Sequence, residues 1–391
     1  SKSELLTWSG SVAMATSRRH WIELHMVLSK KEVNFYRKHT GNSRHSTRIN
    51  RRPAMRIKLS SVVSVQPMLF QDIPLQGFSF FQLETFPRVY YLMVRSDIQL
   101  HEWIEAFVNC LGKEILTSPF DDSYYVESAA NGGQEPVLPS RFSEPAGDAY
   151  LAKSACWRLD KKRVFNYRRI IFNPAAMSNR YSSMSPNAFI ENILANVLTL
   201  TSPVTGNSNN NNNGSSSSSS SSSGNNSSGV GIGGNSEVDS SLLTTSRSSA
   251  FKWVRFLDEI SWLQTINVSA LEESQRIAFF LNLYHIMVIH GSLVVGPPPA
   301  WNYWNAFFNN ITYLFSYEIL STSDVEYNIL KAAMARPSSL SIIPVPLHQF
   351  PAFALTQRDF RLNFCINNGS KSMPSMVPIY TPDNLDDMLD E

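Results

Sequence analysis

Three polar side chains interrupt an otherwise apolar stretch between residues 277 and 291, and two of them are the first candidates for chemistry in this chain. Asn282, His285 and His290 stand among phenylalanine, leucine, isoleucine and tyrosine residues. A buried amide or imidazole costs free energy unless a hydrogen bond compensates it. Two interpretations follow. Neighbouring backbone groups satisfy these side chains inside a core helix, or Asn282 and His290 form part of the wall of a pocket.

The element that must position these side chains is a helix. Ser269 and Glu272 have the spacing of a capping box, which predicts the start of the helix, and Gly291 predicts its end. Apolar residues occupy nearly all sides of this helix, so it must be buried all round. The uncharged run from Ile277 to Val295 is close to the length of a membrane span. The polar side chains, the acidic first turn and Gly291 favour a core helix over a span.

Charge is distributed unevenly along the chain. The whole sequence has 34 Lys and Arg against 32 Asp and Glu, but residues 1–58 have 13 against 3, a local charge of +10. Residues 251–391 have 8 against 13, a local charge of −5. The N-terminal end therefore suits an anionic surface, and the C-terminal end does not.

Length and cysteine content limit the class of protein. A chain of 391 residues has room for two or three domains. Cys110, Cys156 and Cys365 are few and widely spaced, which predicts a reducing, cytoplasmic compartment without a disulfide framework. No targeting segment is recognisable. The chain starts without methionine and ends within an expected helix, so it is expected to be a fragment.

Residues 1–113 are expected to form short strands closed by one helix. Apolar and polar residues alternate over 20–28, as in a half-buried strand. Ser96 and Gln99 form a second capping box, and apolar residues including Trp103 follow at helical spacing. Further strands are expected at 32–38, 56–65, 78–84 and 88–94. The pattern predicts an all-β barrel or sandwich with a C-terminal helix.

Five pieces follow one another in this region: RHWIEL, EVNFYRK, FSFFQLET, RVYYLMV and SDIQLHEWIEAFVNCL. In this order they resemble a pleckstrin homology (PH) domain over roughly residues 3–113. The resemblance implies that Trp103 is a core residue. It also implies a lipid-binding end that uses a basic residue ending the first strand and a basic triplet entering the second. The corresponding candidates are Arg18, Arg19, His20, Arg37 and Lys38.

Two features of that end favour general attraction to anionic phospholipid over stereospecific recognition of a phosphoinositide. His20 occupies the last triplet position, and histidine is largely neutral at pH 7. The expected first strand, 4–9, ends without Lys or Arg. Further basic residues, Arg44, Arg48, Arg51, Arg52, Arg56 and Lys58, fill the following loop. A solvated basic loop without a ligand stays an alternative, whereas nucleic acid is disfavoured because interleaved aromatic residues are missing.

Residues 114–184 are expected to be a linker. Its basic part, 151–173, is interpreted as a solvated face, with a second membrane-facing or docking segment as the alternative. Ser185 and Pro186 open a helix, and residues 202–249 consist of Asn, Ser and Gly runs that predict a disordered insertion.

The remaining chain predicts a mostly helical α+β domain over 185–391. Expected elements are a helix at 251–266, a short strand at 313–320, a third capping box at 323–326 and a buried strand at 361–366. Three motifs, 277–290, 324–326 and 364–385, agree in order and resemble the domain-of-unknown-function family DUF547. The chain is therefore expected to be a multi-domain protein.

The departures from the DUF547 pattern concern chemistry. Asn368 and Met373 stand where the pattern has cysteines, and Tyr327 stands where it has histidine. A thioether cannot replace a thiolate nucleophile. His290 and Glu326 are left as a candidate base and an orienting carboxylate. Neither metal-ligand spacing nor a Gly-rich phosphate loop is present, so no cofactor and no metal are expected.

Two functions of different classes result. The first is a cytoplasmic, peripheral membrane adaptor or scaffold in signalling, whose PH-like domain binds anionic lipid or a partner protein and whose DUF547-like domain is an interaction or degenerate catalytic module. The second is a hydrolase or transferase with a pocket around Asn282, His290 and Glu326. The first is favoured, because no sulfur nucleophile stands where the pattern has one.

Overall fold

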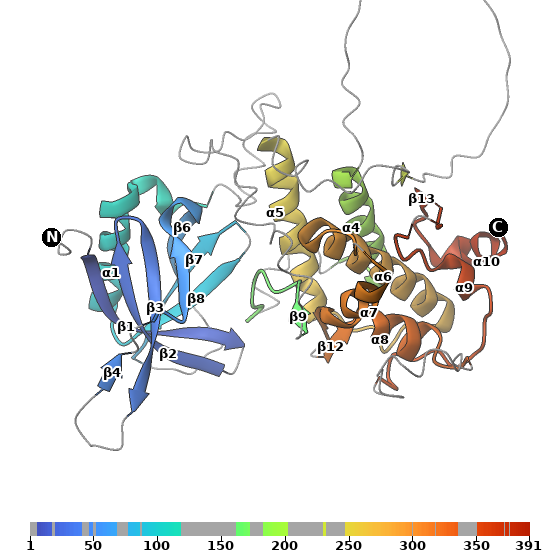
Figure 1. The fold of residues 1–391 in the computed structure, drawn as a ribbon, viewed down its shortest axis with the longest axis horizontal. Helices are drawn as coiled ribbons and strands as arrows, with labels where there is room; N and C mark the ends of the chain where they lie inside the picture. The colour runs from blue at the N-terminus through green and yellow to red at the C-terminus, as the bar shows by residue number, and fades with distance from the viewer. Residues whose placement is uncertain are drawn as a thin grey trace, which may run out of the picture.

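A computed structural model describes most of the chain as two bodies joined by a short segment (Figure 1). The described residues are 6–17, 20–40, 47–49, 52–68, 77–86, 88–118, 162–172, 183–201, 230–231, 247–298, 300–316, 318–334, 350–370, 372–374 and 376–391. Most of the expected linker and most of the expected insertion at 202–249 lie outside them.

The N-terminal body is an antiparallel sheet closed by one helix, which confirms the predicted PH-like fold class. In the sheet the strand order is β4-β3-β2-β1-β8-β7-β6, and β5 pairs with β3. The strands are β1 Leu6–Ser17, β2 His20–Ser29, β3 Glu32–Thr40, β4 Thr47–Ile49, β5 Met55–Lys58, β6 Val62–Met68, β7 Ser79–Thr85 and β8 Val89–Val94. Helix α1, Asp97–Leu111, follows β8, and 3-10 turns lie at Leu59–Ser61 and Lys113–Leu116.

The core of this body follows the predicted alternation. Leu24, Met26 and Leu28 of β2 are buried, and α1 adds Trp103 and Phe107. Ser96 caps α1, as expected, by accepting a hydrogen bond from the Gln99 backbone at 3.3 Å.

Two predicted strands have different bounds in the structure. The first strand is not confined to 4–9: β1 continues to Ser17 because its register with β2 runs from Leu6↔Ser29 to Ser17↔His20. The expected strand 56–65 is divided by the 3-10 turn Leu59–Ser61, so that β5 pairs with β3 and β6 pairs with β7.

The C-terminal body is mostly helical, which confirms the α+β prediction. Its helices are α4 Pro186–Thr201, α5 Arg247–Ser261, α6 Glu273–Val295, α7 Trp301–Asn310, α8 Thr322–Asp324, α9 Leu362–Cys365 and α10 Leu385–Asp390, with a π-helical turn at Val325–Leu330 and 3-10 turns at Trp262–Gln264 and Pro382–Asn384. Its strands are β9 Arg163–Val164, β10 Val230–Gly231, β11 Ile311–Phe315, β12 Glu318–Ser321 and β13 Met376–Val377.

Helix α6 is the central helix of this body, but both predicted ends are wrong. Glu272 and Gln275 form the capping box, whereas Ser269 bonds Asn267. The helix continues past Gly291 to Val295. A Cβ on Gly291 would collide with the Ile311 side chain, so the glycine permits close packing of α6 on β11 and does not end the helix.

By length and composition, α6 is apolar enough to cross a membrane. Most of it is nevertheless buried by the rest of the protein, and the buried residues include all three polar ones, Asn282, His285 and His290. A long helix that is covered on all sides in this way is the core helix of its domain.

The structure corrects two further local predictions. Residues 361–366 do not form a buried strand, because helix α9 turns Leu362 into the core and leaves Phe364 81% exposed. The third capping box uses Ser321 with Asp324, and Ser323 is not its cap.

The packing of Trp103 generates a stability prediction. Trp103→Ala should lower the free energy of unfolding by about 3–5 kcal/mol, because it removes a side chain that is 2% exposed. Ile98→Ala on the same helix should change it by less than about 0.5 kcal/mol, because Ile98 is 73% exposed. Urea unfolding of both variants tests this, and equal effects would contradict a core role for Trp103.

Candidate functional site

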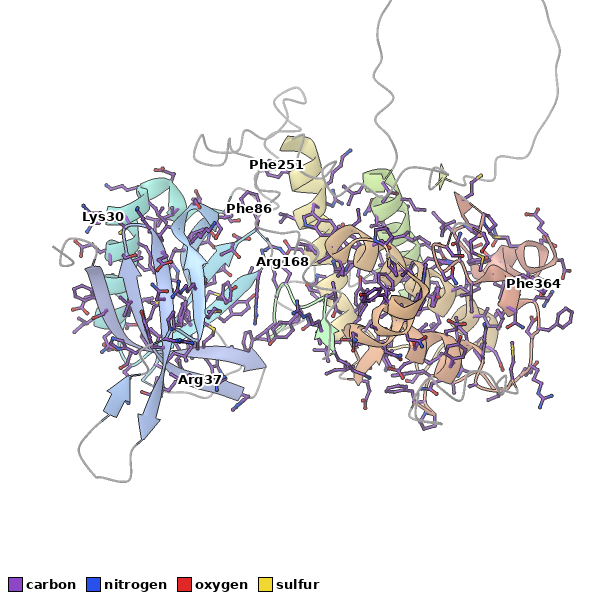
Figure 2. All side chains as sticks on the ribbon, in the orientation of Figure 1. Lys30, Arg37, Phe86, Arg168, Phe251 and Phe364 are labelled. Carbon is purple, nitrogen blue, oxygen red and sulfur yellow. The ribbon has the colours of Figure 1, made fainter. Side chains whose placement is uncertain are left out.

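The candidate lipid-binding end lies where β2 begins and β3 leaves the core. Arg37 pairs with Leu24 across the two strands and belongs to the row of β3 that contains buried Phe35. His20 belongs to the corresponding row of β2. Both side chains are exposed. The strand register therefore brings these two candidates to one end and one face of the sheet, and Figure 2 labels Arg37 there.

The remaining lipid-binding candidates are only partly described. Arg18 and Arg19 lie outside the described residues, although the chain must pass through them to join Ser17 of β1 to His20 of β2. The backbone of Lys38 belongs to β3, and its side chain is not described.

The other cations of this region do not all face the same way. Arg56 and Lys58 of β5 are exposed and pair with Asn34 and Glu32, which alternate with the core-facing row of β3. They therefore add to the charge of the body without facing the same side of the sheet as Arg37.

Part of the expected basic linker, residues 162–172, joins the two bodies, and we call it the bridging segment. At the C-terminal body, the bridging segment is held by β9, which pairs in parallel with β11. Asn166 donates to the Ile260 and Leu314 carbonyl oxygens at 3.3 and 2.8 Å and accepts from the Leu314 N–H at 2.8 Å. At the N-terminal body, Phe172 of the bridging segment packs against the rings of Trp21 and Tyr91 in the antiparallel sheet.

Arg168 is fully buried between the two bodies, where Figure 2 labels it beside Phe86. Its Nη1 donates to the Thr85 and Phe86 carbonyl oxygens at 2.7 and 2.6 Å, and its Nη2 donates to Glu84 at 3.0 Å. The Arg168 backbone oxygen accepts from the Val89 N–H at 2.8 Å. The interpretation of this segment as a solvated face is therefore wrong at Arg168 and Arg169, because both arginines are paired with the buried Glu84 carboxylate.

Arg169 completes the cluster. It donates to Asp258 of α5 at 2.8 Å and to Glu84 at 3.2 Å. Burial alone would lower the pKa of Arg169, but the carboxylates of Asp258 and Glu84 outweigh this effect and raise it. The second oxygen of Glu84 accepts from the Ser64 hydroxyl at 2.7 Å. Both bodies thus contribute a carboxylate to the two arginines.

Arg168 and Asp258 also contact each other without a hydrogen bond. Arg168 Nε lies 2.8 Å from Asp258 Oδ1, but its N–H is not directed at an acceptor. The contact is an ion pair held by charge alone, and Arg169 makes the directed bond to the same oxygen. We refer to Glu84, Arg168, Arg169 and Asp258 as the ion cluster.

The ion cluster generates a second stability prediction. Arg168→Met should lower the free energy of unfolding by about 3 kcal/mol or more, because it leaves the buried Glu84 carboxylate with fewer partners. Arg95→Met is the matched control, because Arg95 pairs with Glu23 at 3.9 Å on the exposed surface and should contribute less than about 0.5 kcal/mol. Urea or thermal unfolding measures both, and a neutral Arg168→Met would refute the role of the cluster.

The three pocket candidates of the C-terminal body contact different partners. Asn282 bonds both backbone groups of Tyr380, at 2.7 Å to its oxygen and 3.0 Å from its nitrogen. This is what the core-helix interpretation expects of it. Glu326 accepts from Lys331 at 2.9 Å and from the Tyr284 hydroxyl at 3.5 Å.

His290 is enclosed by aromatic rings. Its Nδ1 lies 2.7 Å from the Tyr313 hydroxyl, and the rings of Phe165, Trp253 and Phe256 contact it edge to face. Burial lowers the pKa of His290 to about 3. Among the described residues, no hydrogen bond joins any two of His290, Asn282 and Glu326, and each of them contacts a different partner.

His285 was not assigned to a site from the sequence, yet it contacts the segment in which the family pattern has its cysteines. Its Nε2 accepts from the Asn367 N–H at 3.1 Å, and its ring stacks on Tyr380. Burial lowers the pKa of His285 to about 4. The sequence offered only one signal, a second histidine on the apolar helix.

Cys365 forms hydrogen bonds with Arg361 and Tyr380, and none with His290 is found in the described part of the chain. Its thiol donates to the Arg361 carbonyl oxygen at 3.4 Å, and its carbonyl oxygen accepts from the Tyr380 hydroxyl at 3.4 Å. Burial raises the pKa of this thiol, which disfavours a thiolate. Within the described part of the chain, no three His, Cys, Asp or Glu side chains gather as ligands of a metal ion would.

The two buried histidines predict a pH dependence. Unfolded histidine takes up a proton below about pH 6.5, whereas His285 and His290 stay neutral in the folded protein down to about pH 4 and 3. Their contribution to stability is therefore present above pH 6.5 and is lost as the pH falls, by up to about 1.4 kcal/mol per pH unit for each histidine.

Unfolding in urea between pH 7 and 5.5 measures this slope. His290→Gln should make the slope shallower, because glutamine does not take up a proton in this pH range. An unaltered slope in His290→Gln would show that this imidazole titrates as it does in the unfolded chain.

Comparison with known proteins supports the two-part architecture. Residues 268–391 match the model of a family described as "Protein of unknown function, DUF547". This part of the chain is similar to the DUF547 family, which confirms the predicted resemblance, and we refer to the C-terminal body that contains it as the DUF547 domain. No curated protein matches the chain.

Solved structures similar to the chain contain PH domains. The human ARAP2 N-terminal PH domain is 19% identical, over 30% of this chain and 87% of that chain, with a TM-score of 0.20. The linker-DH/PH domains of p115-RhoGEF are 14% identical, over 29% of this chain and 30% of that chain, with a TM-score of 0.21. The chain thus spans less than a third of the p115-RhoGEF structure. At such scores, the PH-like assignment of the N-terminal body rests on its own strands and closing helix.

Proposed function

We propose that this protein is a peripheral membrane adaptor whose PH-like domain binds anionic phospholipid through the end that carries His20 and Arg37. The observation that carries the proposal is the shared position of these side chains, exposed at one end of one face of the sheet. The sequence adds Arg18 and Arg19 between the paired residues Ser17 and His20. Each basic residue near an acidic membrane surface contributes about 1 kcal/mol of attraction.

The junction between the domains supports an adaptor. Because the ion cluster ties β7 to α5 through the bridging segment, a membrane-bound PH-like domain would hold the DUF547 domain in one orientation. The DUF547 domain would then act as an interaction module or a degenerate catalytic module at a cytoplasmic membrane surface.

The hydrolase or transferase alternative lacks a supporting observation. A general base must reach the proton that it removes, and His290 is enclosed by aromatic rings with a pKa of about 3. Glu326, the proposed orienting carboxylate, is engaged by Lys331 and Tyr284.

Vesicle sedimentation tests the adaptor proposal. The full chain should sediment with vesicles that contain phosphatidylserine and not with vesicles of phosphatidylcholine alone, and salt should weaken the binding. The double variant Arg19→Glu/Arg37→Glu should bind at least about tenfold more weakly, because it reverses two charges at the proposed end.

Lys30→Glu is the matched control. Lys30 is exposed in the turn before β3, at the opposite end of that strand from Arg37 (Figure 2). It should reduce binding less than Arg37→Glu alone does. Equal binding to neutral and acidic vesicles, or equal losses in Lys30→Glu and Arg37→Glu, would count against the proposed end.

A further inference from the structure

Two phenylalanine side chains of the DUF547 domain point into solvent. Phe360 is 74% exposed and Phe364 is 81% exposed. The two residues lie four apart on one helical turn, in which the Phe360 carbonyl accepts from the Asn363 N–H at 3.1 Å and the Arg361 carbonyl accepts from the Phe364 N–H at 2.9 Å. Phe360 lies in the turn that leads into α9 and Phe364 lies within α9, so both exposed rings belong to the same short segment. Figure 2 shows Phe364 at the edge of the molecule far from the N-terminal body.

Carboxylates border this pair of rings. Arg361, which lies between the two phenylalanines in the sequence, donates to Asp359, Asp386 and Asp390 at 2.7, 3.1 and 2.7 Å. The side chains of Asp386 and Asp390 are themselves 86% and 69% exposed. Asp387 and Glu391 of the same C-terminal segment are also exposed. The exposed rings therefore have an acidic border.

The negative charge of this border indicates which kind of partner could cover the rings: a bilayer, a second copy of the chain or another protein. Exposed apolar side chains mark contact sites when they are grouped. An anionic bilayer would be repelled by the exposed carboxylates of α10. A second copy, related by a twofold axis, would place the same carboxylates against each other. A protein segment with apolar and basic residues would bury the rings and pair with the carboxylates.

We propose that Phe360 and Phe364, bordered by Asp386 and Asp390, form a docking surface for a basic amphipathic helix of a partner protein. The apolar face of such a helix covers the rings, and its lysines or arginines lie over the α10 carboxylates. This proposal rests on the adaptor role proposed above, because it assigns a partner class to the DUF547 domain, but it does not need lipid binding at the PH-like end.

The test uses the full chain and a synthetic helical peptide with leucines on one face and lysines on the other. Fluorescence anisotropy of the labelled peptide should show binding that weakens as salt is added. Phe360→Ser/Phe364→Ser should weaken it at least about tenfold. Asp386→Asn/Asp390→Asn should weaken it and reduce its salt dependence. A peptide with glutamate in place of lysine should not bind.

Ile98→Ser is the matched control, because Ile98 is a similarly exposed apolar residue, 73% exposed, on α1 of the other domain. It should leave peptide binding unchanged, and the melting temperatures of all variants should match the parent. Equal binding by the phenylalanine variant and the parent would overturn the proposal. So would vesicle binding or self-association that disappears with the two rings.

The two proposals fail separately. Loss of vesicle binding in Arg19→Glu/Arg37→Glu with intact peptide binding supports both. Peptide binding by a chain that never sediments with acidic vesicles supports this docking surface and removes the membrane role. Vesicle binding without any binding of the leucine-lysine peptide overturns the docking surface alone.

Discussion

A buried carboxylate in the N-terminal sheet is the constraint on which the two-domain arrangement depends. Glu84 is fully covered, and a buried charge is tolerated only when it is paired and hydrogen-bonded. Its oxygens are bound by Ser64 of the same sheet and by Arg168 and Arg169 of the bridging segment. Asp258 of the DUF547 domain shares the second of these arginines. A free N-terminal body would leave Glu84 without its counterions.

The central helix α6 meets the same requirement with neutral groups. The Asn282 amide forms hydrogen bonds with both the backbone N–H and the carbonyl oxygen of Tyr380, as a neighbouring strand would. The His290 ring forms a hydrogen bond with the hydroxyl of Tyr313. Because neither histidine of this core has a nearby carboxylate among its hydrogen-bond partners, burial keeps both neutral. The polar side chains that first suggested chemistry thus serve to specify how the helix packs.

The surfaces of the two domains differ in chemistry. The PH-like domain exposes His20 and Arg37 at the end of β2 and β3, and the DUF547 domain exposes apolar rings beside carboxylates at α9 and α10. The ion cluster joins the domains between these surfaces, as the positions of Arg37, Arg168 and Phe364 in Figure 2 show. A junction with several buried hydrogen bonds holds such surfaces in a fixed relation, whereas a solvated linker would not.

The sequence by itself determined the elements that local signals encode. Alternation predicted β2, the Ser96 cap predicted α1, and apolar residues all round predicted that α6 is buried. Each of these signals depends on residues within a few positions of one another, where backbone geometry decides the outcome. The two family resemblances were likewise recognisable from ordered motifs.

Only the tertiary structure decided what the charged and small residues do. Arg168 could be recognised as a bridge and not as a solvated cation only once Glu84 and Asp258, remote in the sequence, were placed beside it. Gly291 was predicted to end a helix, but it is the neighbouring Ile311 that requires a glycine there. The apolar residues of 361–366 are compatible with either a strand or a helix. In the structure they form helix α9, which packs Leu362 into the core. Burial and charge pairing are properties of neighbours in space, and a linear sequence does not contain those neighbours.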